Sequence, residues 1–191
     1  DCSGNSASCS QTIEVIDTTP PTISCPSVVS PIQCPNLPVF PTPSYGDACD
    51  LEPSLTYADV TTPGNCPGVY SITRTWTVRD CSGNSASCSQ TIEVIDTTPP
   101  IISCPSDRTF ECSAIGDFGV ATATDNCDEL VVPTYADEVV QGECPQERTI
   151  YRTWTAVDDC GNTSSCRQII NIVDTTPPII SCPSDRTFEC S

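Results

Sequence analysis

The chain contains no histidine, no lysine and no methionine among its 191 residues. Without histidine and lysine it lacks the commonest general base and the amine nucleophile, and it has no nucleophile elbow or phosphate-binding loop. Paired carboxylates occur only at duplicated turn positions, so we expect no enzyme activity and no catalytic residues. Seven basic residues, all arginine, face 25 acidic ones, for a formal net charge of −18. This charge excludes nucleic acid and disfavours an anionic membrane surface as partners.

Internal repetition is the main feature of the sequence. Residues 1–27 return at 80–106 with one change, Thr22 becoming Ile101, and return more loosely at 159–184. A period of 79 and then 78 residues is too long for a helical solenoid unit and fits a small all-β domain. The chain is therefore interpreted as part of a tandem array.

The Asp-Thr-Thr-Pro-Pro motif marks the boundaries between repeats. The chain then begins and ends in mid-repeat, with no initiating methionine, no signal peptide and no apolar run long enough to span a bilayer. We therefore expect an excerpt from a longer secreted protein. Its expected parts are the last strand of a preceding repeat (1–17), two complete repeats (18–96 and 97–174) and the first strand of a following repeat (175–191).

Strand patterns dominate each repeat. Residues 71–78 and 150–156 alternate with a period of two, which points Trp76 and Trp154 inward as core residues in preference to a sugar-stacking role. Arg74 and Arg152 lie on the same strands, where a structural ion pair is expected. About seven short strands per repeat, with nineteen prolines against helix formation, predict an immunoglobulin-like β-sandwich. The last strands are expected at 89–95 and 167–173, with Ile92, Val94, Ile170 and Ile172 inward.

The segments between repeats should be stiff. Each contains two consecutive prolines, which fix their own φ angle and restrict the residue before them, and no glycine. The array is therefore predicted to form a semi-rigid rod.

Sixteen cysteines are spread evenly along the chain, six in each complete repeat. The absence of histidine and of any CxxC pair argues against zinc. A disulfide framework is the favoured interpretation, because so small a β domain has a marginal core, and it places the chain in an oxidising compartment.

Three motifs together resemble a known family: DTTPP-x-I-x-CP at the start of a repeat, T-D-N at 124–126, and W-T-x-x-D-x-C-x-G-N-x-x-x-C at its end. They resemble the hyalin repeat (HYR) family in its cysteine-rich form, over essentially the whole chain. The resemblance implies an extracellular immunoglobulin-like module, found in repeats and associated with adhesion or surface structures. The two cysteines of the family's simple form fall on Cys25 and Cys88, and on Cys104 and Cys166.

The cysteines are paired by placing them on such a sandwich. Its first and last strands begin at the end that carries the BC and FG loops, which allows a bond between the first and sixth cysteines; the loop cysteines meet at that end and the remaining two at the opposite end. Neighbour pairing such as Cys104 with Cys112 is the alternative, although these residues lie about 26 Å apart in an extended strand. Cys2, Cys9, Cys182 and Cys190 would find partners outside the chain. The expected bonds are Cys25–Cys88, Cys34–Cys66, Cys49–Cys81, Cys104–Cys166, Cys112–Cys144 and Cys127–Cys160.

Aspartates gather at the same end as the BC and FG loops. Several carboxylates at a junction between repeats could coordinate Ca²⁺ and stiffen it. The alternative is that they accept hydrogen bonds from turn amides, since no loop carries a dense D-x-D-x-D ladder. The candidate ligands are Asp17, Asp47, Asp50, Asp80, Asp96, Asp125, Asp128, Asp158 and Asp159.

Glycans are the other expected addition, and no cofactor is required. Asn162 begins an N-glycosylation sequon in an exposed turn, whereas its counterparts Asn5 and Asn84 do not. The richness in Ser, Thr and Pro also permits O-linked sugar.

The leading hypothesis is structural: an extracellular stalk, fibre or filament in which strands carry load, disulfides limit extension and the linkers preserve direction. Its partners would be further copies of the repeat, in the same chain or in fibre neighbours. The alternative is a cell-surface adhesin that recognises protein or glycan through the BC and FG loops, in a calcium-dependent way. The two repeats differ most at 28–68 and 107–146, where a binding surface would lie.

Overall fold

The computed structural model describes residues 2–190, which form two compact units that divide between Thr97 and Thr98. We call them unit 1 and unit 2, and each is described by itself. Strands, turns and coil make up the described residues, so this part of the chain offers no helix that could cross a membrane. Of the two expected partial repeats, residues 1 and 191 lie outside the described residues.

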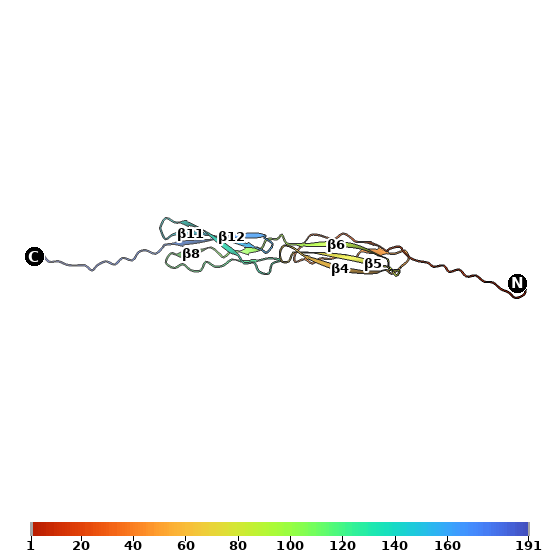
Figure 1. The fold of residues 1–191 in the computed structure, drawn as a ribbon. Helices are drawn as coiled ribbons and strands as arrows, with labels where there is room; N and C mark the ends of the chain where they lie inside the picture. The colour runs from red at the N-terminus through yellow and green to blue at the C-terminus, as the bar shows by residue number, and fades with distance from the viewer. Residues whose placement is uncertain (1, 191) are drawn as a thin grey trace. The chain divides into compact units, whose positions relative to one another are not determined.

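Unit 1 is built from a four-stranded sheet and a two-stranded sheet. The larger sheet has the order β2-β6-β5-β4, in which only the β2–β6 pair is parallel, and the smaller pairs β1 with β3. Figure 1 shows β4, β5 and β6 side by side. The strands are β1 (Thr22–Ser24), β2 (Ile32–Gln33), β3 (Ser44–Gly46), β4 (Ser54–Pro63), β5 (Tyr70–Arg79) and β6 (Ser85–Ile95).

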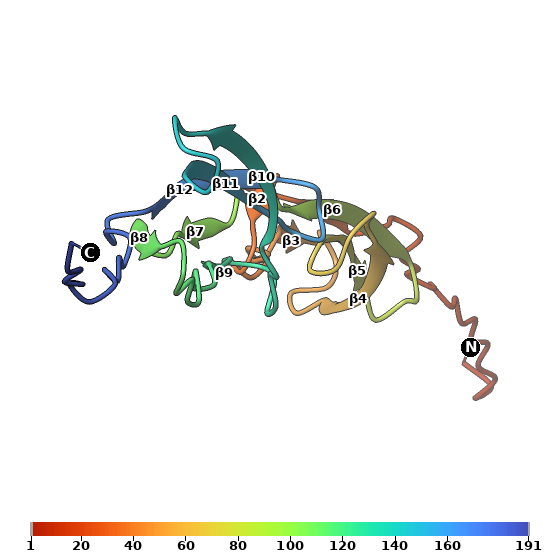
Figure 2. The same ribbon diagram turned by 90° about the vertical axis from the view of Figure 1, so that its left-hand side faces the viewer.

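Unit 2 repeats this topology. Its larger sheet has the order β8-β12-β11-β10 with β8 parallel to β12, and β7 pairs with β9, as Figure 2 shows. Each unit thus has six strands among the described residues, where about seven were expected. The strands are β7 (Ile101–Ser103), β8 (Arg108–Glu111), β9 (Thr122–Thr124), β10 (Thr134–Gln141), β11 (Arg148–Val157) and β12 (Thr163–Val173).

The alternating pattern of β5 and β6 builds the core of unit 1. Trp76 and Val78 are buried on β5, and Ile92 and Val94 are buried on β6, which confirms their predicted inward orientation. Polar residues on β6 alternate with them and face solvent, as a sheet with one covered face requires. The same phase holds in unit 2, where the core contains Trp154, Ala156, Ile150, Ile170 and Ile172.

A disulfide ties the two sheets of each unit together. Cys25 follows β1 of the small sheet and is bonded to Cys88 of β6, with the Cα atoms 5.9 Å apart. In unit 2 the equivalent bond joins Cys104 and Cys166, again at a Cα separation of 5.9 Å. Because Cys25 and Cys88 are 63 residues apart in sequence, the bond closes a long loop.

The outer strands of the larger sheets are open to solvent. Every residue of β4 and of β10 is at least partly exposed, and only one edge of each strand is paired. These edges carry acidic residues, Asp59 on β4 and Asp137 and Glu138 on β10. Charged residues on an edge strand oppose edge-to-edge pairing with another sheet.

Candidate functional site: the two ends of the repeat

Each unit has a leading end, where the chain enters it, and a trailing end, where the chain leaves. In unit 1 the leading end is formed by the loop 47–53 after β3 and the turn 80–84 between β5 and β6. Asp17 lies beside this turn, because the side-chain amide of Asn84 donates a 3.3 Å hydrogen bond to its carbonyl oxygen. The two loops are joined directly, since the amide of Cys81 donates a 2.8 Å hydrogen bond to Oδ2 of Asp50.

The turn 80–84 depends on one aspartate and one glycine. Asp80 accepts 2.8 Å hydrogen bonds from the amide and the side chain of Asn84. Gly83 has a φ of 95°, a left-handed conformation that favours glycine. In unit 2 Asp158 and Asn162 make the same two bonds, and Gly161 has a φ of 91°. The shared D-x-x-G-N spacing is therefore explained by turn geometry.

Most of the other predicted calcium ligands also accept hydrogen bonds from turn amides. Oδ1 of Asp47 accepts from the amides of Cys49 and Asp50, both at 2.8 Å, and these bonds lower the pKa of Asp47. Asp125 accepts from Cys127 and Asp128 in the equivalent turn, and Asp128 accepts at 3.1 Å from the amide of Asp159. This is the alternative that the sequence left open.

Among residues 2–190, two buried carboxylate oxygens at the leading ends have no hydrogen-bond partner: Oδ2 of Asp17 and Oδ2 of Asp125. In unit 1, ligand atoms of Asp17, Asp47 and Cys49 lie within 4.8 Å of one another. A hard cation would need several oxygens from this group, yet one of its three members offers sulfur. Calcium binding stays a prediction.

Asp158 is only 5% exposed, so burial and hydrogen bonding compete to set the pKa of its carboxyl group. Desolvation acts to raise its pKa, but hydrogen bonds from Asn162, Cys160 and Gly161 outweigh it and lower the pKa. The carboxylate therefore stays charged because the turn surrounds it with donors.

The trailing end lies beside the parallel strand pair. The amide of Cys34 donates a 3.0 Å hydrogen bond to the carbonyl of Ile95, and in unit 2 Cys112 donates a 2.8 Å bond to Val173. Ligand atoms of Glu111, Cys112 and Asp174 lie within 4.8 Å of one another. The cysteine of this strand thus lies directly against the segment by which the chain leaves the unit.

The cysteines at these ends are in two states. Cys34, Cys66, Cys127 and Cys160 are disulfide-bonded. The expected bonds Cys49–Cys81 and Cys112–Cys144 are not formed, and these four residues are thiols. The Cys49 thiol lies against the carboxylates of Asp17 and Asp47, of which Asp17 contributes most to raising the pKa of Cys49.

The trailing cysteines of unit 2 are thiols as well. The Cys112 sulfur donates a 3.2 Å hydrogen bond to Oε1 of Gln146 instead of bonding to Cys144. Cys2, Cys9, Cys182 and Cys190 are also thiols. The pairs Cys34–Cys66 and Cys127–Cys160 stay predictions, since bonding at these residues does not by itself name their partners.

A guanidinium clamp fixes the outer strand of each larger sheet. Arg152 of β11 makes two parallel 2.8 Å hydrogen bonds to Asp137 of β10, and its guanidinium carbon lies 3.7 Å from the ring centre of Tyr135. In unit 1 Arg74 holds Asp59 in the same way at 2.7 Å and lies 4.0 Å from the ring centre of Tyr57. The hydrogen bonds from arginine lower the pKa of both aspartates. The predicted ion pair is present in both units.

Each buried tryptophan is held by a buried glutamine that the sequence analysis did not single out. Nε1 of Trp76 donates a 2.9 Å hydrogen bond to Oε1 of Gln90, whose own amide donates to the carbonyl of Pro26. Gln168 is fully buried, accepts from Trp154 and donates to the carbonyls of Ser106 and Phe118. These bonds satisfy the polar groups that the core would otherwise isolate.

The sequon residue Asn162 has a structural role of its own, because its side-chain nitrogen donates to Asp158. Asn84 makes the same bond in a turn that is not a sequon. The presence of asparagine at this position is thus explained without sugar, and glycosylation of Asn162 stays a prediction.

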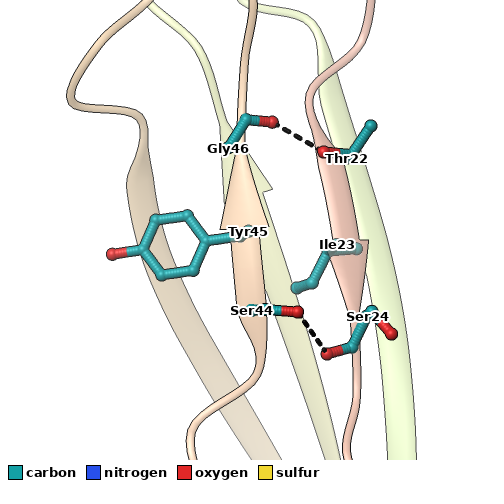
Figure 3. A pocket seen from close by; sticks show the side chains of 6 residues that line it. All are labelled: Thr22, Ile23, Ser24, Ser44, Tyr45 and Gly46. Atoms are coloured by element: carbon teal, nitrogen blue, oxygen red, sulfur yellow. Dashed lines mark hydrogen bonds between the residues drawn. The ribbon is translucent and has the colours of Figure 1, made fainter.

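Several hollows lie on the variable part of unit 1 or near it. One covers the β1–β3 pair, where Figure 3 shows Tyr45 directed away from Ile23 and the hydroxyl of Thr22 bonded to the carbonyl of Gly46. Another is lined by apolar residues of the segment that differs between the repeats. Its lining includes Val28, Val29, Ile32, Leu37, Val39 and Pro41.

Comparison with known proteins identifies the repeat. Residues 22–94 match the HYR-like domain with 4 cysteines. Residues 22–94 belong to the HYR-like family. The chain is 34% identical over 202 residues to hyalin of Lytechinus variegatus and 37% identical over 206 residues to hyalin of Strongylocentrotus purpuratus, in each case over 97% of this chain. The chain spans 37% and 17% of the length of these two relatives.

Two solved structures show weaker similarity to this chain. The protocadherin gammaB7 EC3-6 cis-dimer is 13% identical with a TM-score of 0.35, covering 81% of this chain and 51% of that one. The human mucin-like protocadherin EC1-2 is 10% identical with a TM-score of 0.34, covering 81% and 99%. The all-β fold with two separate sheets in each unit rests on the strand topology given above.

Proposed function

We propose that this chain is a segment of an extracellular structural element, a stalk, fibre or filament built from tandem disulfide-stapled HYR-like domains. The observation that carries the proposal is the reproduction of one rigid frame in both units. The disulfide between the first and last strands, the arginine clamp and the buried tryptophan–glutamine pair recur at equivalent positions. The segments that differ between the units leave this frame unchanged.

The frame provides a short covalent path for load. Cys25 follows Asp17 by eight residues, and Cys88 precedes Asp96 by eight residues. A pull along the chain can therefore pass through the Cys25–Cys88 bond and bypass the 63-residue separation between these cysteines. A structural element benefits from such a path because the residues between Cys25 and Cys88 cannot be pulled out while the bond is intact.

An extracellular location is supported by the chemistry of the chain. Eight of its cysteines are disulfide-bonded, a state that persists in oxidising compartments. The net charge of −18 keeps an exposed array soluble. The two relatives named hyalin, matched over nearly the whole chain, support the same conclusion.

Electron microscopy of the native material that contains this chain tests the proposal. Long, uniform filaments with a regular axial repeat are the expected result. Dispersed single molecules with no tendency to form stalks or filaments would contradict it.

A second candidate function, ligand binding, is favoured by the apolar hollow of unit 1. Leu37 and Val39 are each 77% exposed there, and the corresponding segment of unit 2 begins with the charged residues Asp107 and Arg108. A binding protein would lose capture of a protein or glycan probe when Leu37 is replaced by aspartate. Ile101→Asp, which changes an equally exposed apolar residue of unit 2, is the matched control.

A further inference from the structure

The larger sheet of each unit has an inner face, which carries the core, and an outer face. The inner residues match between the units, since Trp76 and Gln90 recur as Trp154 and Gln168. The outer faces differ at equivalent strand positions. Unit 1 has Val60, Thr62, Thr73, Ser89 and Thr91 there, and unit 2 has Glu138, Val140, Tyr151, Arg167 and Ile169 in their places. The fold therefore does not require the outer residues of unit 2.

An arginine and a tyrosine are stacked on the outer face of unit 2. Arg167 and Tyr151 alternate with buried residues of β12 and β11, and both are accessible to solvent. The guanidinium carbon of Arg167 lies 4.0 Å from the ring centre of Tyr151. Glu138 of β10 and Ile169 of β12 lie directly opposite Tyr151, one on each side. The stacking restricts the arginine side chain, so less entropy is lost when its N–H groups bind a carboxylate.

The charges of this face are balanced and unused. Glu138 and Arg167 are the charged residues among the outward positions of β10, β11 and β12, so these positions are neutral as a set in a chain of net charge −18. The two ion pairs found among residues 2–190 are those of the clamp arginines, Arg74 and Arg152. Arg167 and Glu138 thus keep their hydrogen-bonding groups available for a partner.

Charge complementarity favours a second copy of the chain as that partner. Two copies with a net charge of −18 repel one another over most of their surfaces, but the outer face of unit 2 is neutral. It has an acid on one side of Tyr151 and an arginine on the other, so it is complementary to itself. Tyr151, Ile169 and Val140, which is 48% exposed, add apolar surface.

The spacing of the two charges is compatible with sheet packing. Glu138 and Arg167 are separated by two strand spacings across the sheet and by two residues along it, which gives about 10 Å and about 7 Å. A two-fold axis that exchanges the two positions makes the strands of the two copies cross at about 70°. Sheets that pack face to face at steep angles form one of the two common classes of sheet packing.

We propose that the outer face of unit 2 binds the same face of a second copy of this chain, with Arg167 of each copy paired with Glu138 of the other. Tyr151, Ile169 and Val140 lie beside these pairs and lose exposed apolar surface in the contact. The proposal goes beyond the proposed function, because copies of a binding protein would pair through this face as well as copies of a filament.

Sedimentation equilibrium of the full chain tests the contact, at concentrations up to about 1 mM and in about 0.15 M salt, which screens long-range repulsion. The chain should form dimers, and Arg167→Glu or Glu138→Arg should each abolish them. Glu138→Arg is the sharper variant, because it reduces the net charge from −18 to −16 and would strengthen association if only overall repulsion mattered.

Mixing the two charge variants shows whether the partner is the same face. In a mixed dimer both pairs again join one acid and one arginine, so dimers should return although each variant alone stays monomeric. Variants that remain monomeric when mixed would overturn the proposal. So would a chain that is monomeric at all concentrations, or dimers that survive both variants. Dimers that are lost only in Leu37→Asp would place the contact at the apolar hollow of unit 1 and would also overturn it.

The double variant Ser87→Glu/Ser89→Glu is the matched control. It makes the chain as negative as Arg167→Glu does, at outward positions of unit 1, and should leave the dimer intact. Should the charge variants fail to fold, Arg167→Ser and Glu138→Val replace them, because unit 1 carries serine and valine at these positions of the same fold. Dimers that persist in both of these variants would refute the proposal.

Discussion

Pulling on a single repeat tests how the frame carries load. With Cys25–Cys88 intact, only the eight residues on either side of the bond can straighten, and they extend to about 55 Å at roughly 3.4 Å per residue. Reduction frees the 63-residue separation between the cysteines, which adds about 210 Å. Unit 2, with a separation of 62 residues, should give nearly the same step.

Single-molecule force spectroscopy of the chain, held by its two ends, measures these steps. Oxidised repeats should lengthen by no more than about 55 Å each, and repeats in reductant should show two steps longer by about 210 Å. Oxidised steps longer than about 200 Å would show that load does not pass through the disulfide, and the reasoning would fail.

Four further perturbations probe the core, the clamp and the charges. Gln168→Met should destabilise unit 2 by about 1–3 kcal/mol in urea unfolding, because a buried indole N–H and two carbonyls lose their partner. Arg152→Lys should cost about 1–3 kcal/mol, since lysine cannot bond Asp137 through two parallel donors. Acid should unfold the protein, because the pKa values of Asp137 and Asp158 are lowered in the folded state. The contribution of these two carboxylates to folding stability is complete above about pH 4 and is lost as the pH falls through their folded pKa values. Tryptophan fluorescence measures this unfolding. If calcium stiffens the leading ends, a chelator should lower the melting temperature in calorimetry.

For each of these four predictions, one outcome would contradict it. Gln141→Met, at an exposed position, is the control for Gln168→Met. An equal loss of unfolding free energy in both variants would show that the burial of Gln168 does not matter for stability. Arg74→Lys should lower the free energy of unfolding less than Arg152→Lys does, because Arg74 is more exposed. The reverse order would contradict this prediction. Fluorescence that is unchanged down to pH 2 would exclude the aspartates as stabilising groups. An unchanged melting temperature in chelator would remove the calcium hypothesis.

The strands and their buried faces could be predicted because the alternation is strong. On β5 the apolar residues share one phase, and a strand covered on one side must bury that phase. The buried glutamines carried the same signal: Gln90 is in phase with Ile92 and Val94, and Gln168 with Ile170 and Ile172. A polar residue in an apolar phase indicates a buried hydrogen bond, and this inference was available from the sequence.

The short strands and the states of the end cysteines could not be predicted in the same way. β2 contains only two residues, too few for a periodic pattern, and the prolines around it obscure its pairing. Whether Cys49 bonds to Cys81 depends on where each thiol points, which a sequence does not give. Sequence spacing shows which cysteines share an end but not the orientation of their side chains.

The bond between Cys25 and Cys88 also bears on damage by proteases. Every peptide bond between these two residues lies inside a covalently closed ring. A single cut there, even in the exposed β4, opens the ring but leaves both ends of the repeat attached to each other. A nicked molecule would therefore keep its continuity in a protease-rich setting, and severing it would take a cut in the short stretches outside the ring.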